Sequence, residues 1–172
     1  LEENVKALAF DVFGTVVDWR GSIIREATAF GAEHGIDADW TRFADAWRAA
    51  YRPSMDRVRT GELPWTTLDR LHRMSLDTIL VDFGITGLSE AETDALNRAW
   101  HRLQPWPDAV AGLTRLKKRF VIAPLSNGNI SLMADLARRN GWHWDAILGA
   151  EIARDYKPKP EVYRAACDAF DC

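Results

Sequence analysis

Residues 5–15 read VKALAFDVFGT, an apolar run that ends at a single carboxylate, Asp11, and turns at Gly14 before Thr15. Short apolar runs bounded by turn residues are typical of buried strands. Open α/β folds place their chemistry at the carboxyl ends of parallel strands. A carboxylate in that position can act as a covalent nucleophile when its neighbours keep it ionised and orient it. The stretch therefore predicts an α/β fold and a reactive aspartate together.

Composition describes an ordinary globular chain: 172 residues, of which 47% are hydrophobic and 27% charged. The formal net charge of -3 argues against a nucleic-acid partner. The only cysteines are Cys167 and Cys172, which disfavours a disulfide framework or a cysteine metal site and favours a reducing, cytoplasmic location. No apolar stretch has the length of a membrane span, and no secretory signal is visible, so we expect no membrane partner.

Short apolar runs alternate with amphipathic stretches along the chain, and a second strand is predicted over residues 120–125. This alternation indicates a Rossmann-like, doubly wound parallel sheet covered by helices. Residues 19–104 instead carry apolar side chains at helical spacing and contain no convincing strand. We therefore expect a discontinuous α/β core domain, residues 1–18 and 105–172, interrupted by an inserted α-helical cap subdomain of residues 19–104.

Two further segments place polar groups near the predicted position of Asp11. Ser126 and Asn127 follow the second strand, so they are expected at the same sheet edge as Asp11. Lys157 precedes a predicted helix, and Pro158 stiffens its approach. Each segment alone has an ordinary interpretation as turn residues. Their shared placement at strand ends and helix starts favours a site in which the lysine keeps Asp11 ionised.

With these segments the chain resembles the haloacid dehalogenase superfamily, residues 11–15 forming the first motif, Ser126-Asn127 the second and Lys157 the third. Most members of that superfamily are magnesium-dependent phosphatases with a second Asp two positions after the nucleophile. Here that position is Phe13, whose ring cannot protonate a leaving alcohol. The departure is similar to the branch of L-2-haloacid dehalogenases (type II), in which halide leaves without protonation.

The resemblance implies hydrolysis of short-chain (S)-2-haloacids to (R)-2-hydroxy acids, with inversion at the α-carbon and an ester intermediate on Asp11. It implies that Lys157 holds and polarises Asp11, and that Thr15 stabilises the oxyanion formed when the ester is cleaved. Ser126 would bind the substrate carboxylate. Arg48, in the cap, would receive the halide or steer the anionic substrate, although an exposed cap arginine is the alternative for this residue.

The same resemblance implies a pocket for substrate and halide lined by Val12, Phe13, Arg48, Ser126, Asn127 and Tyr163. It also implies that the partners are a small anionic 2-haloalkanoate and the halide, that no cofactor or metal is needed, and that a homodimer forms. A tyrosine at the spacing of Tyr163 is more often core packing. The four histidines show no metal-ligand spacing and are interpreted as structural or surface residues. The preferred halogen, and the tryptophans that line the pocket, stay open.

Two alternatives remain: a magnesium-dependent phosphatase of the same superfamily, which Phe13 disfavours, and a noncatalytic binding module on this fold. The superfamily's fourth, acidic motif has no counterpart before Cys172. We therefore expect the C-terminal part of the core to be missing, and the 172-residue form to be unstable or poorly active. An incomplete sheet would expose an edge strand, which favours aggregation.

Overall fold

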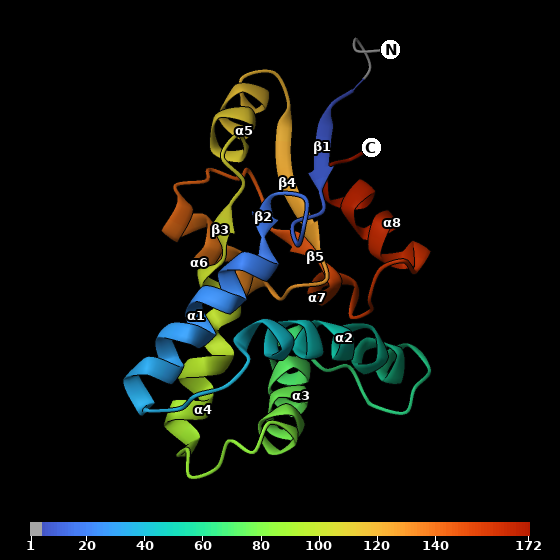
Figure 1. The fold of residues 1–172 in the computed structure, drawn as a ribbon. Coiled ribbons are helices and arrows are strands. Elements are labelled where there is room, and N and C mark those ends of the chain that lie inside the picture. The colour runs from blue at the N-terminus through green and yellow to red at the C-terminus, as the bar shows by residue number, and fades with distance from the viewer. Residues whose placement is uncertain (1–4) are drawn as a thin grey trace. The chain divides into compact units, whose positions relative to one another are not determined.

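The chain divides into two compact units in a computed structural model that describes residues 5–172 (Figure 1). One unit combines the N-terminal segment up to Asp18 with Gln104–Cys172. The other is Trp19–Leu103. Strands occur only in the first unit, as far as the described residues go.

The first unit is built on a parallel sheet of three strands, β1 (Ala7–Phe10), β4 (Val121–Ser126) and β5 (Leu148–Gly149). Their order is β1-β4-β5, with Ala9 opposite Ala123. The predicted α/β fold with a parallel sheet is confirmed, and β4 lies one residue later than expected. Because the strands are parallel, their carboxyl ends meet at one edge of the sheet.

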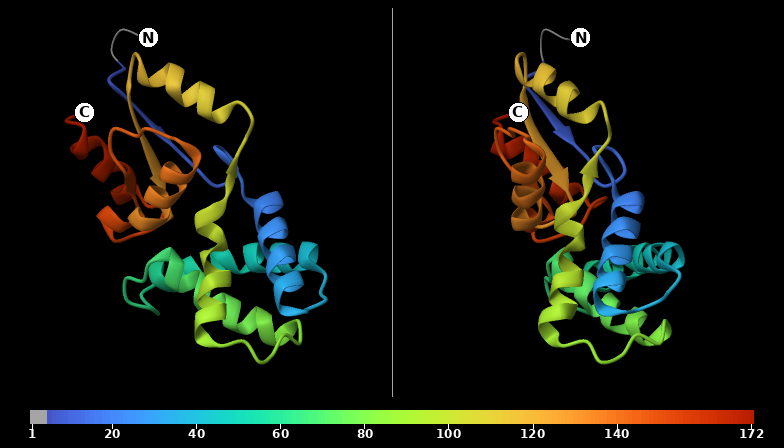
Figure 2. Two further views of the ribbon diagram at one scale, coloured as in Figure 1. Left: turned by 90° about the vertical axis from the view of Figure 1, so that its left-hand side faces the viewer. Right: turned by 60° about the vertical axis from the view of Figure 1, so that its left-hand side comes forward.

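Helices cover both faces of this sheet, as Figure 2 shows. Neighbouring residues of a strand point to opposite faces. Ile122 of β4 borders a hollow with α5 (Ala109–Lys117), whereas Leu125 packs with Val162 of α8 (Pro160–Ala169). The sheet is therefore doubly wound. The remaining helices of this unit are α6 (Ile130–Asn140) and α7 (Ala150–Ala153).

A short antiparallel pair lies where the chain leaves and re-enters this unit. It consists of β2 (Val17–Asp18) and β3 (Gln104–Pro105), with Val17 opposite Pro105. Strands of two residues are too short to show a hydrophobic period, so they could not be predicted from the sequence.

The second unit is helical. Its elements are α1 (Trp19–His34), α2 (Trp40–Arg59), α3 (Leu68–Asp82), α4 (Glu90–Asn97) and the 3-10 helix η2 (Arg98–Arg102). Helix α2 packs against α1 and α3, and α4 packs against α3. Phe43, Trp47 and Trp100 are fully buried between them. The rings of Trp47 and Trp100 meet edge to face, 5.5 Å apart, which is a favoured aromatic geometry. Both tryptophans are therefore core residues of the helical unit.

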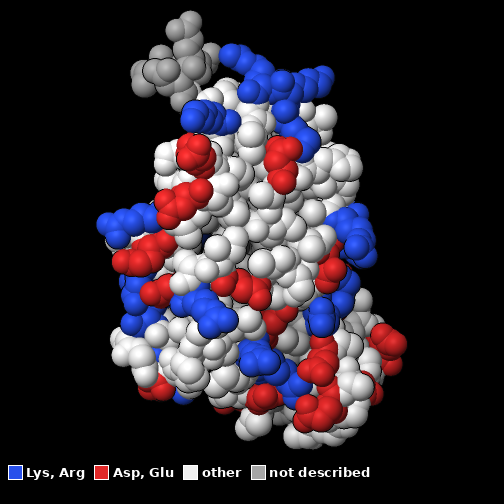
Figure 3. Space-filling view, turned by 180° about the vertical axis from the view of Figure 1, so that it is seen from behind, with Lys and Arg blue, Asp and Glu red and all other residues white. Residues whose placement is uncertain are grey.

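Charged side chains of both signs are interspersed over the face shown in Figure 3, with no broad basic patch. None of the described helices has the length and apolar character needed to cross a bilayer.

Candidate active site

Asp11 directly follows β1 and opens a tight turn. The N–H groups of Thr15 and Val16 both donate to the carbonyl of Val12, at 3.2 and 2.9 Å. Gly14 has a φ of 92°, a conformation that a side chain disfavours, which explains the glycine at this position. The turn brings the Thr15 hydroxyl back to the aspartate, where Oγ1 donates to Oδ2 of Asp11 at 3.1 Å.

Lys157 supplies the positive charge beside this carboxylate. Its Nζ lies 2.8 Å from Oδ1 of Asp11, and its side chain is only 14% exposed against 49% for Asp11. The backbone N–H of Lys157 donates to Oδ1 of Asn127 at 2.8 Å, and the peptide to Pro158 is cis. The Asn127 bond ties the segment before α8 to the loop after β4. Two side chains thus hold the Asp11–Lys157 pair in place: Thr15 bonds to Asp11, and Asn127 bonds to the backbone of Lys157.

Ser126 and Phe13 lie together near the end of β4. Ser126 is fully buried, and its Oγ accepts the N–H of Gly128 at 3.0 Å. A serine hydroxyl also has one proton to donate, and no described group accepts it. A Cβ added to Gly128 would lie only 3.3 Å from Cζ of Phe13 and from Oγ of Ser126. The loop backbone therefore rests close to the Phe13 ring.

We call Asp11, Phe13, Thr15, Ser126, Asn127 and Lys157 the Asp11 cluster. Chemically, it combines a partly exposed carboxylate, an ammonium beside it, and a buried hydroxyl with its proton free. An apolar ring, Phe13, occupies the position where a second carboxylate would act as an acid. Val12, next to it, is completely buried. Such a set suits nucleophilic attack by the carboxylate on a substrate whose leaving group needs no proton.

Arg48 lies on α2 in the helical unit, among aromatic rings. Its guanidinium carbon is 4.0 Å from the ring centre of Tyr51 and 5.1 Å from that of Trp19. Such cation–π contacts hold a guanidinium without neutralising it. The Nη1 atom is buried and has no hydrogen-bond partner in the described chain. Arg48 is thus positioned by rings and keeps a donor available.

His72 of α3 was not singled out by the sequence. It is 2% exposed, and its ring stacks on that of Trp100 with centres 4.2 Å apart. The pKa of His72 is lowered to about 3, chiefly by burial; Asp69 opposes this shift, and Arg48 and His101 add to it. The imidazole is therefore neutral at neutral pH. No spacing signal in the sequence distinguishes this histidine from the other three.

Tyr163, predicted to line the pocket, lies on α8. Its side chain is 45% exposed on α8 and borders an apolar hollow with Ala7 and Leu125. It is not core packing, and no hydrogen bond within the described chain joins it to the Asp11 cluster. Within residues 5–172, no group of three or more His, Cys, Asp or Glu side chains is placed to hold a metal ion.

Comparison with known families agrees with this arrangement. The model of the haloacid dehalogenase-like hydrolases matches residues 5–171, almost the whole chain. The chain belongs to this family. Among curated members, the chain is 29% identical over 173 residues to (S)-2-haloacid dehalogenase 1 of Pseudomonas sp. (strain CBS-3), with 98% of this chain and 72% of that protein covered. It is 28% identical over 184 residues to (S)-2-haloacid dehalogenase 4A of Burkholderia cepacia, with 96% and 70% covered.

Solved structures of this family are also similar to the chain. The defluorinating L-2-haloacid dehalogenase Rha0230 superposes with a TM-score of 0.95 at 48% identity, over 98% of this chain and 69% of that one. The L-2-haloacid dehalogenase PA0810 gives 0.91 at 46% identity, over 98% and 72%. The haloacid dehalogenase-like fold expected from the motifs is confirmed.

Proposed function

We propose that this protein is an (S)-2-haloacid dehalogenase, which hydrolyses short-chain (S)-2-haloacids to (R)-2-hydroxy acids through an ester on Asp11. The observation that carries the proposal is the Asp11–Lys157 contact of 2.8 Å, combined with Phe13 where phosphatases of the superfamily carry a second Asp. The curated relatives named as (S)-2-haloacid dehalogenases support it.

In the first step an oxygen of the Asp11 carboxylate attacks the α-carbon from the side opposite the halogen. The new carbon–oxygen bond forms as the carbon–halogen bond breaks, and the halide departs with the bonding electrons. Halide is a weak base, so no acid is needed at the position of Phe13. Lys157 orients the carboxylate and, after the attack, polarises the ester carbonyl.

In the second step water attacks the ester carbonyl of Asp11, the resulting oxyanion collapses, and the 2-hydroxy acid and a proton are released. Thr15, whose hydroxyl lies 3.1 Å from the Asp11 carboxylate, stabilises the oxyanion. Ser126, with its unused hydroxyl proton, binds the substrate carboxylate beside Asn127. Arg48 receives the halide, since a guanidinium stays charged and offers several N–H donors.

The first test is halide release from (S)- and (R)-2-chloropropionate and from chloro- and fluoroacetate, without added metal. Fluoroacetate is included because a similar structure is named as defluorinating. We expect release from the (S) enantiomer and the haloacetates, abolished by Asp11→Asn. A parallel assay with p-nitrophenyl phosphate and magnesium tests the phosphatase alternative. Hydrolysis of that ester alone would refute the dehalogenase proposal, and inactivity in both assays would favour a noncatalytic module.

Association as a homodimer and a cytoplasmic location also belong to this proposal. The dimer rests on the resemblance to the L-2-haloacid dehalogenases, and the location rests on the small number of cysteines. Sedimentation equilibrium tests the dimer directly, and a purely monomeric species at micromolar concentration would contradict it.

A further inference from the structure

Arg48 belongs to a closed ring of five side chains in the helical unit, which we call the Arg48 cage. The guanidinium carbon of Arg48 lies 4.0 Å from the ring centre of Tyr51, and the ring centres of Tyr51 and His72 lie 6.1 Å apart. Trp100 stacks on His72 at 4.2 Å, and Trp19 stacks on Trp100 at 6.4 Å. The ring closes where Arg48 lies 5.1 Å from Trp19. The cage thus draws on α1, α2, α3 and η2.

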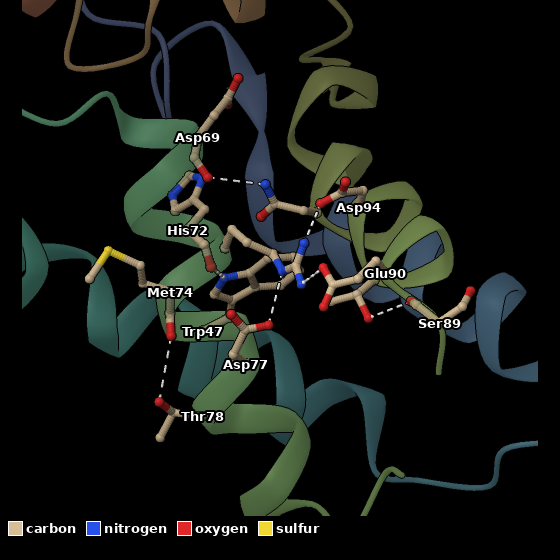
Figure 4. Close-up of polar contacts among 12 residues, drawn as sticks. Trp47, Asp69, His72, Met74, Asp77, Thr78, Ser89, Glu90 and Asp94 are labelled. Atoms are coloured by element: carbon tan, nitrogen blue, oxygen red, sulfur yellow. Dashed lines mark hydrogen bonds and ion pairs between the residues drawn. The ribbon is translucent and has the colours of Figure 1, made fainter. Parts of the chain in front are cut away.

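Buried polar atoms of the cage lack partners. The Nη1 atom of Arg48 and both ring nitrogens of His72 have no hydrogen bond within the described chain. Leaving such a group unsatisfied is destabilising, and native proteins do so rarely. The neighbouring polar groups are already engaged: Trp47 donates to the His72 carbonyl (Figure 4), and Asp69 pairs with His101 at 3.0 Å. An acceptor from outside the chain would satisfy the Arg48 donor and the single N–H of the neutral His72 ring.

The charge of the cage identifies the kind of acceptor. Arg48 forms no ion pair with any carboxylate among the described residues. His72 is neutral, so the cage carries the single positive charge of the guanidinium together with one imidazole N–H. Indole and phenol rings surround these donors and shield them from water. A small, weakly hydrated monovalent anion, such as chloride or bromide, fits this combination because it loses little hydration free energy on entering an apolar cage.

We propose that His72 is a second halide-binding residue, whose ring N–H acts with the Nη1 of Arg48 to bind the halide that leaves the substrate. This inference rests on the proposed function, in which Arg48 receives that halide. Because the imidazole is neutral, it adds a hydrogen bond without adding a second charge, so the halide is bound and still released. His72 then determines how tightly each halide is held.

Bromide binding to the protein tests this directly. With the histidines labelled with ¹⁵N, we expect sodium bromide to shift the ring N–H signal of His72, at an ionic strength held constant with methanesulfonate. Sodium acetate serves as the carboxylate comparison and should leave the signal unchanged. A shift of the His72 signal with acetate but not with bromide would overturn the halide assignment. The absence of a shift with both salts would also overturn it.

The substitution His72→Phe keeps a ring against Trp100 and removes both nitrogens. We expect the dissociation constant for bromide, followed by tryptophan fluorescence, to rise about tenfold or more. His72→Asn loses the ring but keeps an N–H donor, so its loss should be smaller. His34→Phe is the matched control, because His34 also stacks on a ring, that of Phe30, with centres 4.0 Å apart. Its bromide affinity should equal that of the wild type.

If His72→Phe does not fold, His72→Leu provides the same removal of both nitrogens in a smaller side chain. Unchanged bromide affinity in a folded apolar variant would overturn the proposal. The result is independent of turnover. A protein that binds bromide through His72 but releases no halide from haloacids would contradict the proposed function and leave the anion site standing. A dehalogenase whose bromide affinity does not change on substitution of His72 would contradict the anion site and leave the proposed function standing.

Discussion

At the scale of single residues, the contact between Lys157 and Asp11 is the feature on which the chemistry depends. An ammonium 2.8 Å from a carboxylate fixes its orientation, and it opposes the negative charge that builds up during ester hydrolysis. The contact joins residues far apart in sequence, so it exists only in the folded core unit. Its contribution to catalysis can be measured by a substitution that removes the charge of Lys157 and keeps the aliphatic part of its side chain.

We expect Lys157→Met to lower kcat by about 10²–10³-fold, the loss typical of removing one preorganised electrostatic donor. The matched control is Lys159→Met, because Lys159 pairs with Asp155 at 2.9 Å instead of with Asp11. Steady-state halide release by both variants gives the comparison. Equal kcat values for the two variants would mean that Lys157 has no special part in the reaction.

At the scale of elements, β5 supports the end of β4 where Ser126 lies. Gly149 is paired with Ser126 and has a φ of 153°. A Cβ at this position would lie 2.2 Å from the carbonyl oxygen of Ser126, a backbone atom that cannot move aside without displacing the strand. The glycine therefore allows the two strands to approach at the candidate site.

Gly149→Ala is expected to lower the free energy of unfolding by about 3 kcal/mol, because it overpacks a strand pair and strains the backbone. It should also raise KM by displacing Ser126. Gly112→Ala is the control: Gly112 lies within α5 with no atom near its added Cβ, so the same change should stabilise the helix by about 0.5–1 kcal/mol. Urea unfolding measures both, and a neutral Gly149→Ala would contradict the close approach.

At the scale of the whole molecule, the buried His72 makes the stability of the protein depend on pH. The pKa of His72 falls from an ordinary 6.5 to about 3 on folding, chiefly through burial. Between these values the unfolded chain binds a proton that the folded chain does not. The stabilising contribution of the neutral imidazole is thus complete above pH 6.5 and is lost as the pH falls towards 3.

We expect the free energy of unfolding to fall by about 2 kcal/mol more in the wild type than in His72→Phe between pH 7 and pH 5. The carboxyl groups of Asp45, Glu92 and Asp145 have pKa values held below their usual range by ion pairs and hydrogen bonds, so they titrate below this window. Urea titrations at the two pH values provide the difference. Parallel pH dependence in the two proteins would show that His72 is not buried in the neutral form.

The sequence could predict the features that depend on strand ends. Asp11 and Ser126 each follow an apolar run, and parallel strands bring such ends together, so their proximity is a matter of fold class. The two-residue strands were invisible because they contain no full hydrophobic period. The Arg48 cage could not be foreseen either, since its members come from four helices and only packing brings them together.

Tyr163, a position suggested by the family resemblance, lies exposed on α8 beside an apolar hollow. Helical spacing alone does not say which side of a helix faces the chemistry. His72 was hidden for a similar reason: its neutrality comes from burial by neighbours that are distant in sequence.

The central claim, that Asp11 forms an ester which water cleaves at the carboxyl carbon, is tested most directly by a single turnover in ¹⁸O-water. With enzyme in excess over (S)-2-chloropropionate, we expect the 2-hydroxy acid to carry an unlabelled oxygen and the peptide containing Asp11 to acquire ¹⁸O, as read by mass spectrometry. Label in the product of the first turnover, with none in Asp11, would mean that water attacks the substrate directly and would contradict the account.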